Sequence, residues 1–342
     1  MKFVVDPLCG DHLRQAVHPE RPERVEAVQA RLRADGLLAQ TRNARDASDE
    51  ELQRVHAPGY LELLRRETEQ LVGARYLSTG DTLVDATSLR AARRAAGGAI
   101  VAVQASVALG EAVFALVRPP GHHAEPARGM GFCLFNNVVV AARAYQAQHG
   151  GEPRVLIADF DYHHGNGTEA EAGAGLSYIS THAFPAYPGT GSQSYARGGD
   201  LIVNVPLPAG GVSTETFVAV WQHALPHLAR LVRPDLLIVS AGFDYVAGDC
   251  VGDLGVGVEA ATPIAAVIRD VAREYCNGAV TYVLEGGYSI DALTESIAAI
   301  ASICDGAQPR SGAADAKSIP FNLLRPLDNF LGSQETFRKL EN

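Results

Sequence analysis

Short apolar runs, glycine-rich turns and longer amphipathic stretches follow one another along the chain. The runs 155–157 and 236–239 are apolar without alternation, as expected of strands that are covered on both faces. Strands are predicted at 2–5, 113–117, 154–158, 176–180, 201–205, 235–240 and 279–284. Helices are predicted at 23–34, 59–72, 89–108, 136–148, 214–231, 262–275 and 290–303. This alternation predicts an α/β fold with a mainly parallel central β-sheet and helices on both faces.

No repeat or low-complexity linker divides the chain before about residue 305, so residues 1–305 are expected to form a single domain. Ser48 and Glu51 have the spacing of a capping box, which predicts a further short helix. The tail, residues 306–342, shows no clear element. Its apolar residues indicate that it packs on the domain or on a partner subunit: Phe321, Leu323, Leu324 and Phe330.

Composition narrows the class of protein. Hydrophobic residues make up 47% of the 342 and charged residues 20%, which excludes a disordered chain. The net charge of −10 has the wrong sign for a protein that mainly binds nucleic acid. No apolar run approaches the roughly 18–20 residues of a membrane span, and no signal peptide opens the chain. Five cysteines without a CxxC pair suit a reducing compartment, so we expect a cytoplasmic protein, with a homo-oligomer still open.

Polar segments follow four of the predicted strands, at 118–123, 159–167, 241–244 and 285–288. Ligands of an open parallel sheet bind outside the carboxyl ends of its strands. We therefore expect the four segments to converge on one site.

The segment after strand 154–158 contains a candidate metal site. Asp159, Asp161 and His163 alternate, so in an extended chain they share one side. Such a pattern alone is equally typical of a capped turn with solvated aspartates, but Asp244 at another strand end adds a third ligand. Asp161, His163 and Asp244 would leave a coordination position for water, which suits catalytic Zn²⁺, with Fe²⁺ or Co²⁺ as alternatives.

Two further segments contribute candidate catalytic groups. His122 and His123 follow a proline-stiffened turn, and an imidazole there could act as a general base. Histidine pairs more often only pack, but the strand-end position argues against that here. Asp159 and Asn166 are candidates to orient these rings. Tyr288 follows two glycines and could donate its hydroxyl to an oxyanion, although Gly-Gly-Tyr alone is weak evidence.

Together these motifs resemble the metal-dependent histone deacetylase and acetylpolyamine amidohydrolase family, on the arginase–deacetylase fold. The resemblance spans roughly residues 1–305, and its opening motif and Asn166 look most like the class II branch and its bacterial relatives. The motifs occur in family order: His18-Pro-Glu-Arg-Pro-Glu-Arg24, Arg118-Pro-Pro-Gly-His-His123, Gly131-Phe-Cys133, Asp159-Phe-Asp-Tyr-His-His-Gly-Asn-Gly167, Pro188-Gly-Thr-Gly191, Ala241-Gly-Phe-Asp244 and Glu285-Gly-Gly-Tyr288.

The resemblance implies a role for each catalytic candidate. Asp161, His163 and Asp244 would hold Zn²⁺, and His123 would be the general base and acid. His122, paired with Asp159, would act mainly through electrostatics, Asn166 would orient His123, and Tyr288 would bind the scissile carbonyl. These assignments follow from matching positions in the motifs.

It also implies binding residues around this centre. Phe132 and Tyr187 would wall the acyl-amine channel, and Arg21 would line an acetate exit path. Further substrate-binding positions are Gly131, Gly286, Val251 and Asp81. A structural K⁺ would be held by Asp159, Asp161, His163, Ser180 and Thr181.

The expected function is zinc-dependent hydrolysis of acetyl or other short acyl groups from acyl-lysine or small acetylated amines, including polyamines. Gly165 and Val246 stand where the arginase branch needs aspartates for a second metal, so guanidine hydrolysis is disfavoured. Val251 stands where some polyamine-specific relatives carry an acidic residue, and an apolar side chain cannot attract a distant ammonium. The alternative is a catalytically silent relative that binds metal or acyl-amines and acts through protein contacts.

Overall fold

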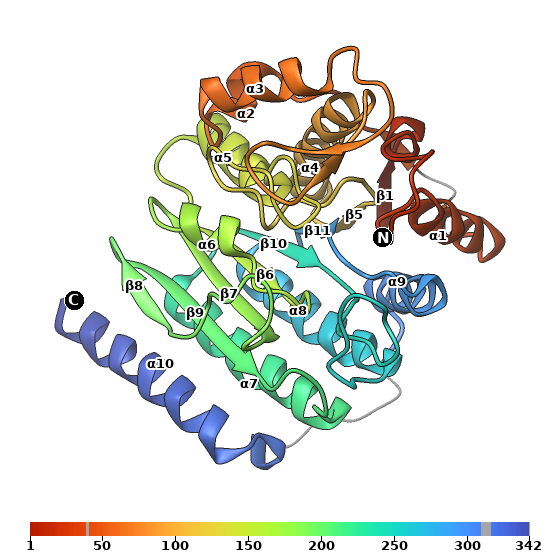
Figure 1. Ribbon diagram of the computed structural model, residues 1–342. Helices are drawn as coiled ribbons and strands as arrows, with labels where there is room; N and C mark the ends of the chain where they lie inside the picture. The colour runs from red at the N-terminus through yellow and green to blue at the C-terminus, as the bar shows by residue number, and fades with distance from the viewer. Residues whose placement is uncertain (39–40, 309–315, 342) are drawn as a thin grey trace.

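A mostly parallel β-sheet forms the centre of the computed structural model, which describes residues 1–38, 41–308 and 316–341 (Figure 1). Within these residues the strand order is β2-β1-β5-β11-β10-β6-β7-β9-β8, and only the edge pair β8–β9 is antiparallel. The strands are β1 (Lys2–Val5), β2 (Thr41–Asn43), β5 (Ala112–Ala115), β6 (Val155–Asp159), β7 (Leu176–Ala183), β8 (Tyr195–Arg197), β9 (Asp200–Leu207), β10 (Leu236–Ala241) and β11 (Val280–Leu284). A separate two-stranded hairpin pairs β3 (Arg75–Tyr76) with β4 (Leu83–Val84).

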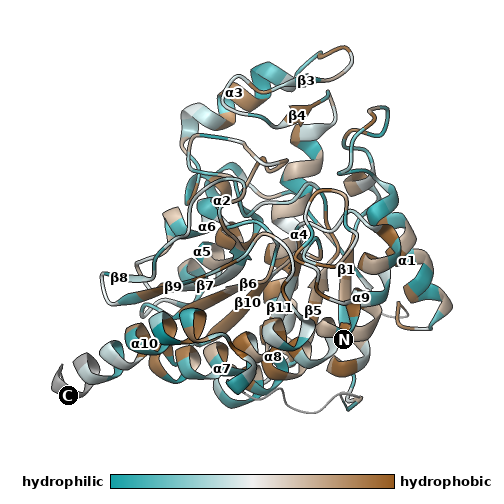
Figure 2. Cartoon of the chain, turned by 60° about the horizontal axis from the view of Figure 1, so that its bottom comes forward, coloured by the Kyte–Doolittle hydropathy of each residue, from teal (hydrophilic) through white to brown (hydrophobic). Residues whose placement is uncertain are grey.

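Helices cover both faces of this sheet, as predicted. Helices α1, α7, α8 and α9 form a continuous layer that buries one apolar core, and α3, α4 and α5 bury the other. Figure 2 shows the hydrophobic strands enclosed between these helices. The helices are α1 (Glu23–Ala34), α2 (Asp49–Gln53), α3 (Pro58–Thr68), α4 (Ser88–Leu109), α5 (Asn137–His149), α6 (Asn166–Glu171), α7 (Thr214–Val232), α8 (Ala261–Tyr275), α9 (Ile290–Cys304) and α10 (Phe321–Glu341). None of the helices in the described ranges is long and apolar enough to cross a bilayer.

The sheet order places the four polar segments together. Strands β5, β11, β10 and β6 are consecutive neighbours and run parallel, so their carboxyl ends lie at one edge of the sheet. Every residue of β6 and β10 is buried, which confirms the interpretation of their unbroken apolar runs. The core of the fold therefore brings chemistry from distant parts of the sequence to one rim.

Element boundaries agree with the prediction to within a few residues, with one exception. Helix α3 ends at Thr68 rather than at residue 72, because the backbone becomes extended at Glu69 and then left-handed at Gln70, with φ of 57°. The capping box of Ser48 and Glu51 opens α2 as predicted. The short elements β2, β3, β4, β8 and α6 were not predicted.

The tail contains a helix, which corrects the expectation that it has no clear element. Helix α10 contacts α7 and β9, and its Leu327 and Leu331 are buried. Leu323, Leu324 and Phe330 pack partly buried against the same core, whereas Phe321 is 72% exposed and does not pack on the domain. Residues 309–315 and 342 of the tail lie outside the described residues.

Candidate active site

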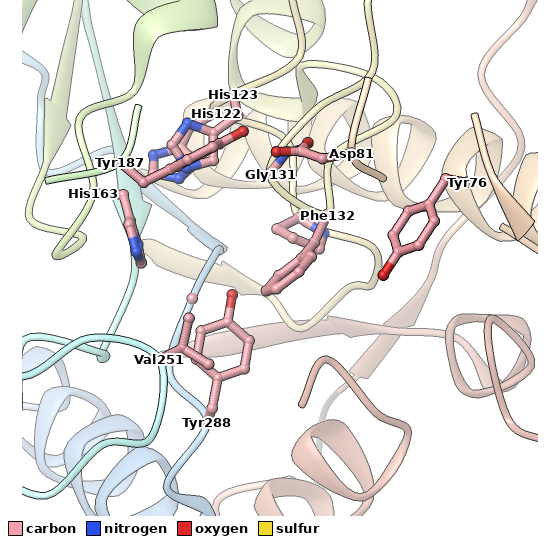
Figure 3. A pocket seen from close by; sticks show the side chains of 12 residues that line it. Tyr76, Asp81, His122, His123, Gly131, Phe132, His163, Tyr187, Val251 and Tyr288 are labelled. Atoms are coloured by element: carbon pink, nitrogen blue, oxygen red, sulfur yellow. The ribbon is translucent and has the colours of Figure 1, made fainter. Parts of the chain in front are cut away.

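A cavity of about 510 Å³ opens at the carboxyl ends of the four neighbouring strands (Figure 3). The predicted channel residues line it, together with Tyr76 and Pro120, which sequence reasoning missed. The lining residues are Tyr76, Asp81, Pro120, His122, His123, Gly131, Phe132, His163, Tyr187, Val251, Gly286 and Tyr288.

Three predicted metal ligands meet at this cavity. The ligand atoms of Asp161, His163 and Asp244 all lie within 4.8 Å of one another, and all three residues are largely buried. His163 Nδ1 is 2.9 Å from Asp244 Oδ2 and 3.2 Å from Asp161 Oδ1. Asp161 follows β6 and Asp244 follows β10, so adjacent strands hold the two carboxylates.

This group fits a divalent cation. Asp244 Oδ2 is buried and has no well-formed hydrogen bond to any described residue. Burial, and then the charge of Asp161, raise the pKa of Asp244 to about 6, because two buried carboxylates repel each other. Two oxygen donors and one imidazole nitrogen form a ligand set typical of Zn²⁺ and also compatible with Fe²⁺ or Co²⁺. A cation here would coordinate Asp244 Oδ2 and offset the excess negative charge.

Each of the paired histidines has its own partner. His122 Nδ1 lies 3.0 Å from Asp159 Oδ2, and His123 Nδ1 lies 2.8 Å from Asn166 Oδ1. The Asn166 amide nitrogen donates to Glu125 Oε1 at 2.8 Å, which fixes its oxygen towards His123. The His123 Nδ1 therefore carries a hydrogen, and its Nε2 keeps a lone pair.

The two rings have opposite electrostatic environments. Burial alone would lower the pKa of His122, but Asp161 and Asp159 outweigh it and raise that pKa to about 10. Burial, and then the neighbouring His122 and His163, lower the pKa of His123 well below its usual value. His122 thus favours the charged form and His123 the neutral form.

Tyr288 is held between two residues at the cavity wall. Its ring makes an edge contact with Phe132 at a centroid distance of 5.8 Å, and the Arg24 guanidinium lies 4.8 Å from the ring centroid. Burial raises the pKa of Tyr288 well above its usual value, so the hydroxyl keeps its hydrogen.

Tyr187 and Asp81 form part of the opposite wall. The Tyr187 ring stands edge-on to His123 at 5.2 Å, and its side chain is hydrogen-bonded to Asp81. Asp81 Oδ1 also accepts the Gly131 N–H at 2.8 Å. The Asp81 carboxylate thereby links Tyr187 to Gly131.

The structure places Arg21 and Arg24 in different surroundings, and the role of Arg21 in an exit path stays a prediction. Arg21 is exposed and does not line the cavity, whereas Arg24 of the same motif is fully buried beneath Tyr288. Arg24 donates to the carbonyls of Gly287 and Glu285, each at 2.6 Å, and to Glu20 at 3.0 Å.

Three other buried residues support the site, although the sequence predicted no role for them: Glu285, Glu20 and Arg118. Glu285 Oε2 accepts the N–H groups of Gly121 and His122 at 2.6 and 3.1 Å, which anchors the turn before the histidines. Glu20 also pairs with Arg118 at 2.6 Å. Burial alone would raise the pKa of Glu20, but Arg118 and Arg24 lower this pKa to about 2.

The residues expected around K⁺ lie on β6, β7 and the segment after β6. Asp159 pairs in register with Ser180. The Ser180 hydroxyl contacts His182 Nδ1 at 2.8 Å, and Thr181 Oγ1 accepts the Trp221 indole N–H at 3.1 Å. A monovalent cation at these residues stays a prediction.

Fold and cavity together define an α/β protein of the deacetylase class. The chain belongs to the histone deacetylase family, because the model of the histone deacetylase domain matches residues 18–304. It is 38% identical over 306 residues to histone deacetylase 15 of Arabidopsis thaliana, covering 86% of this chain and 54% of that protein. It is also 38% identical over 284 residues to a histone deacetylase-like amidohydrolase of Pseudomonas aeruginosa, covering 80% of this chain and 73% of the relative.

A third relative and one solved structure extend the comparison. The human polyamine deacetylase HDAC10 is 38% identical over 315 residues, covering 86% of this chain and 46% of that protein. The crystal structure of the HDA15 HD domain superposes with a TM-score of 0.85 at 33% identity, covering 99% of this chain and 97% of that one. The chain thus spans about half the length of two of these curated relatives. These comparisons confirm the family and the fold.

Proposed function

We propose that this chain is a metal-dependent amidohydrolase, with zinc as the expected metal, that removes acetyl or other short acyl groups from amines. The observation that carries this proposal is the buried group of Asp161, His163 and Asp244, placed beside His123 and Tyr288 at one cavity. Residues 1–305 would form the catalytic domain, with the tail packed on it.

The side chains around the cavity supply the remaining chemistry. A divalent ion held by the three ligands would acidify a water and polarise the acyl carbonyl. His123 accepts the proton of the attacking water at Nε2, because its Nδ1 hydrogen is committed to Asn166. The Tyr288 hydroxyl donates to the carbonyl oxygen as negative charge develops there. His123 then passes its proton to the leaving nitrogen as the C–N bond breaks, which releases a free amine and a carboxylate.

The channel walls support an acylated alkylamine as the substrate. Phe132 and Tyr187 offer ring surfaces to a methylene chain, and Asp81 is the one aspartate or glutamate lining the described cavity. The net charge of −10 adds a long-range bias towards cationic molecules. Val251 at the wall provides no charge for a distant ammonium, so we propose acyl-lysine or a small acylated amine rather than a dedicated polyamine.

A structural K⁺ is part of the same proposal. The paired positions Asp159 and Ser180 and the neighbouring Thr181 lie behind the divalent site, where a second cation would offset the Asp159 charge. Loss of stability on replacing K⁺ salts with tetramethylammonium salts would support this site, and unchanged stability would contradict it.

The test is turnover of acetyl-, propionyl- and butyryl-lysine peptides and acetylated polyamines by metal-replete protein. Tyr288→Phe should lower turnover by about 10²–10³-fold with the metal retained, because one oxyanion donor is lost. Asp244→Asn should instead release the metal, which elemental analysis measures. Turnover by no substrate, with one divalent ion bound, would favour the silent metal-binding relative.

A further inference from the structure

The loop between β10 and α8 contains a buried carboxylate to which the chemistry above gives no role. Asp249 lies in this loop, which also contains the candidate metal ligand Asp244 and Val251 of the cavity wall. It is only 7% exposed. A buried carboxylate is costly unless its oxygens are satisfied, so its partners show what it holds.

Four main-chain N–H groups donate to this carboxylate. Tyr288 and Ser289 donate to Oδ2 at 2.6 and 2.7 Å. Val251 and Gly252 donate to Oδ1 at 2.9 and 3.3 Å. One oxygen therefore holds the turn that carries Tyr288, and the other holds the wall of the cavity.

This contact also lies next to the start of a helix. Helix α9 begins immediately after Ser289, whose own side chain makes no capping hydrogen bond. The first N–H groups of a helix need an acceptor, and a negative charge at that end is favourable. Asp249 binds the N–H groups of the two residues that precede α9, so a loop about 40 residues away in the sequence places a carboxylate near the N-terminus of this helix.

We propose that Asp249 is a positioning residue, which holds the Tyr288 hydroxyl in place and couples it to the cavity wall at Val251. Asp249 fixes the Tyr288 backbone through its N–H, while Arg24 holds the preceding carbonyl of Gly287. The proposal rests on the proposed function, since it concerns the oxyanion donor of that reaction. It assigns no contact between Asp249 and the substrate.

Asp249→Asn tests this assignment because it keeps the shape but replaces one acceptor oxygen with a donor. We expect kcat to fall by about 10–100-fold, since a misplacement of about 1 Å can cost about 10²-fold. KM and metal content should change little. The matched control is Asp253→Asn: this exposed carboxylate accepts the N–H groups of Gly248 and Gly255 in the same loop and should leave kcat unchanged.

A double-mutant cycle with Tyr288→Phe separates positioning from general damage. If Asp249 acts through the Tyr288 hydroxyl, Asp249→Asn should lower kcat by less than about threefold in the Tyr288→Phe background. An equal loss in both backgrounds would overturn the proposal. If thermal unfolding shows that Asp249→Asn does not fold, Asp249→Glu replaces it. This variant keeps the charge, and its kcat is measured in the wild-type and Tyr288→Phe backgrounds.

Binding of a hydroxamate analogue of the acyl group provides a readout that does not need turnover. In metal-loaded protein, Asp249→Asn should weaken the hydroxamate, although by less than Tyr288→Phe does, and wild-type affinity in Asp249→Asn would overturn the proposal. Absence of turnover in the wild type would count against the proposed function, and this binding experiment would still test the role of Asp249.

Discussion

His122 and His123 are adjacent in sequence, yet their surroundings favour different protonation states. Asp159 and Asp161 stabilise a charged His122, whereas His123 faces an amide oxygen and two other imidazoles. A neutral ring with a free Nε2 is suited to accept a proton, and a charged ring is suited to stabilise an anion. The difference depends on the partners of each ring, since the residue type is the same.

Glycine at position 286 is another single-residue requirement. A Cβ built there would lie 2.5 Å from Asp244 Oδ2 and 2.6 Å from Asp161 Oδ2, closer than real Cβ contacts. The Gly286 N–H also donates to Asp161 Oδ2 at 2.8 Å. The main chain at Gly286 therefore packs directly against the carboxylates of Asp161 and Asp244.

Gly286→Ala should weaken metal binding by about 10–100-fold, the range typical of lost outer contacts to metal ligands. The added methyl would displace both carboxylates from their common point. Competition with a chelating dye measures this affinity. Gly59→Ala is the control, because a Cβ at Gly59 of α3 meets no atom within 4 Å, so it should bind metal normally. Equal affinity in both variants would mean that the site adjusts to the methyl.

At the scale of elements, the sequence predicts best where one physical signal dominates. The runs in β6 and β10 are wholly apolar, so burial on both faces was evident. The strand β2 is exposed throughout, and it forms by pairing with β1. Such short edge strands depend on tertiary pairing and carry no periodic pattern of their own.

Helix α10 was missed for a different reason. Leu324, Leu327 and Leu331 have helical spacing, but Pro326 stands among them and argues against a helix interior. Pro326 is the sixth residue of α10, so the helix forms although one main-chain hydrogen bond is lost there. Pairing of Asp328 with His223 at 2.6 Å and of Glu335 with Arg230 at 2.8 Å adds contacts to α7.

The residues of the candidate site also differ in how well the sequence predicts them. Its candidate residues lie in compact motifs at strand ends, so the sequence predicted that the three candidate metal ligands, the histidine pair and Tyr288 would lie close together. The choice between Arg21 and Arg24 depends on which side chain turns inward after the motif. Asp249 acts on main-chain N–H groups about 40 residues away, which no local pattern reveals.

Leu331→Ala in α10 should destabilise the protein by about 2–5 kcal/mol, the cost of truncating a fully buried leucine. Because α10 does not line the cavity, kcat should stay the same. Urea unfolding measures the loss. Phe321→Ala in the same helix removes a 72% exposed ring and should change stability by no more than about 0.5 kcal/mol. If both variants unfold at the wild-type urea midpoint, α10 is not docked in solution.

At the scale of the whole molecule, buried neutral histidines link the fold to pH. Burial lowers the pKa of His12 and of His56 to about 4 and that of His182 to about 3. His56 shows the cause clearly: its Nε2 accepts the Asn136 N–H at 2.9 Å, while Nδ1 contacts the Glu125 carbonyl at 3.1 Å. Protonation of His56 Nε2 would place its N–H opposite the N–H of Asn136, so that two donors would face each other.

Acid should therefore lower the stability of the protein as these histidines become protonated in the unfolded chain. Each folded-state pKa lies below the unfolded value of about 6.5, so between the two the unfolded chain binds more protons. The stability from these histidines is complete above about pH 6.5 and is lost as the pH falls towards 4, by about 1.4 kcal/mol for each unit of pKa difference. Urea unfolding at pH 7, 6 and 5, with metal removed throughout by a chelator, measures this slope. His56→Gln keeps a donor and an acceptor at that position and should flatten the slope, whereas a slope unchanged by this substitution would place the acid sensitivity elsewhere in the fold.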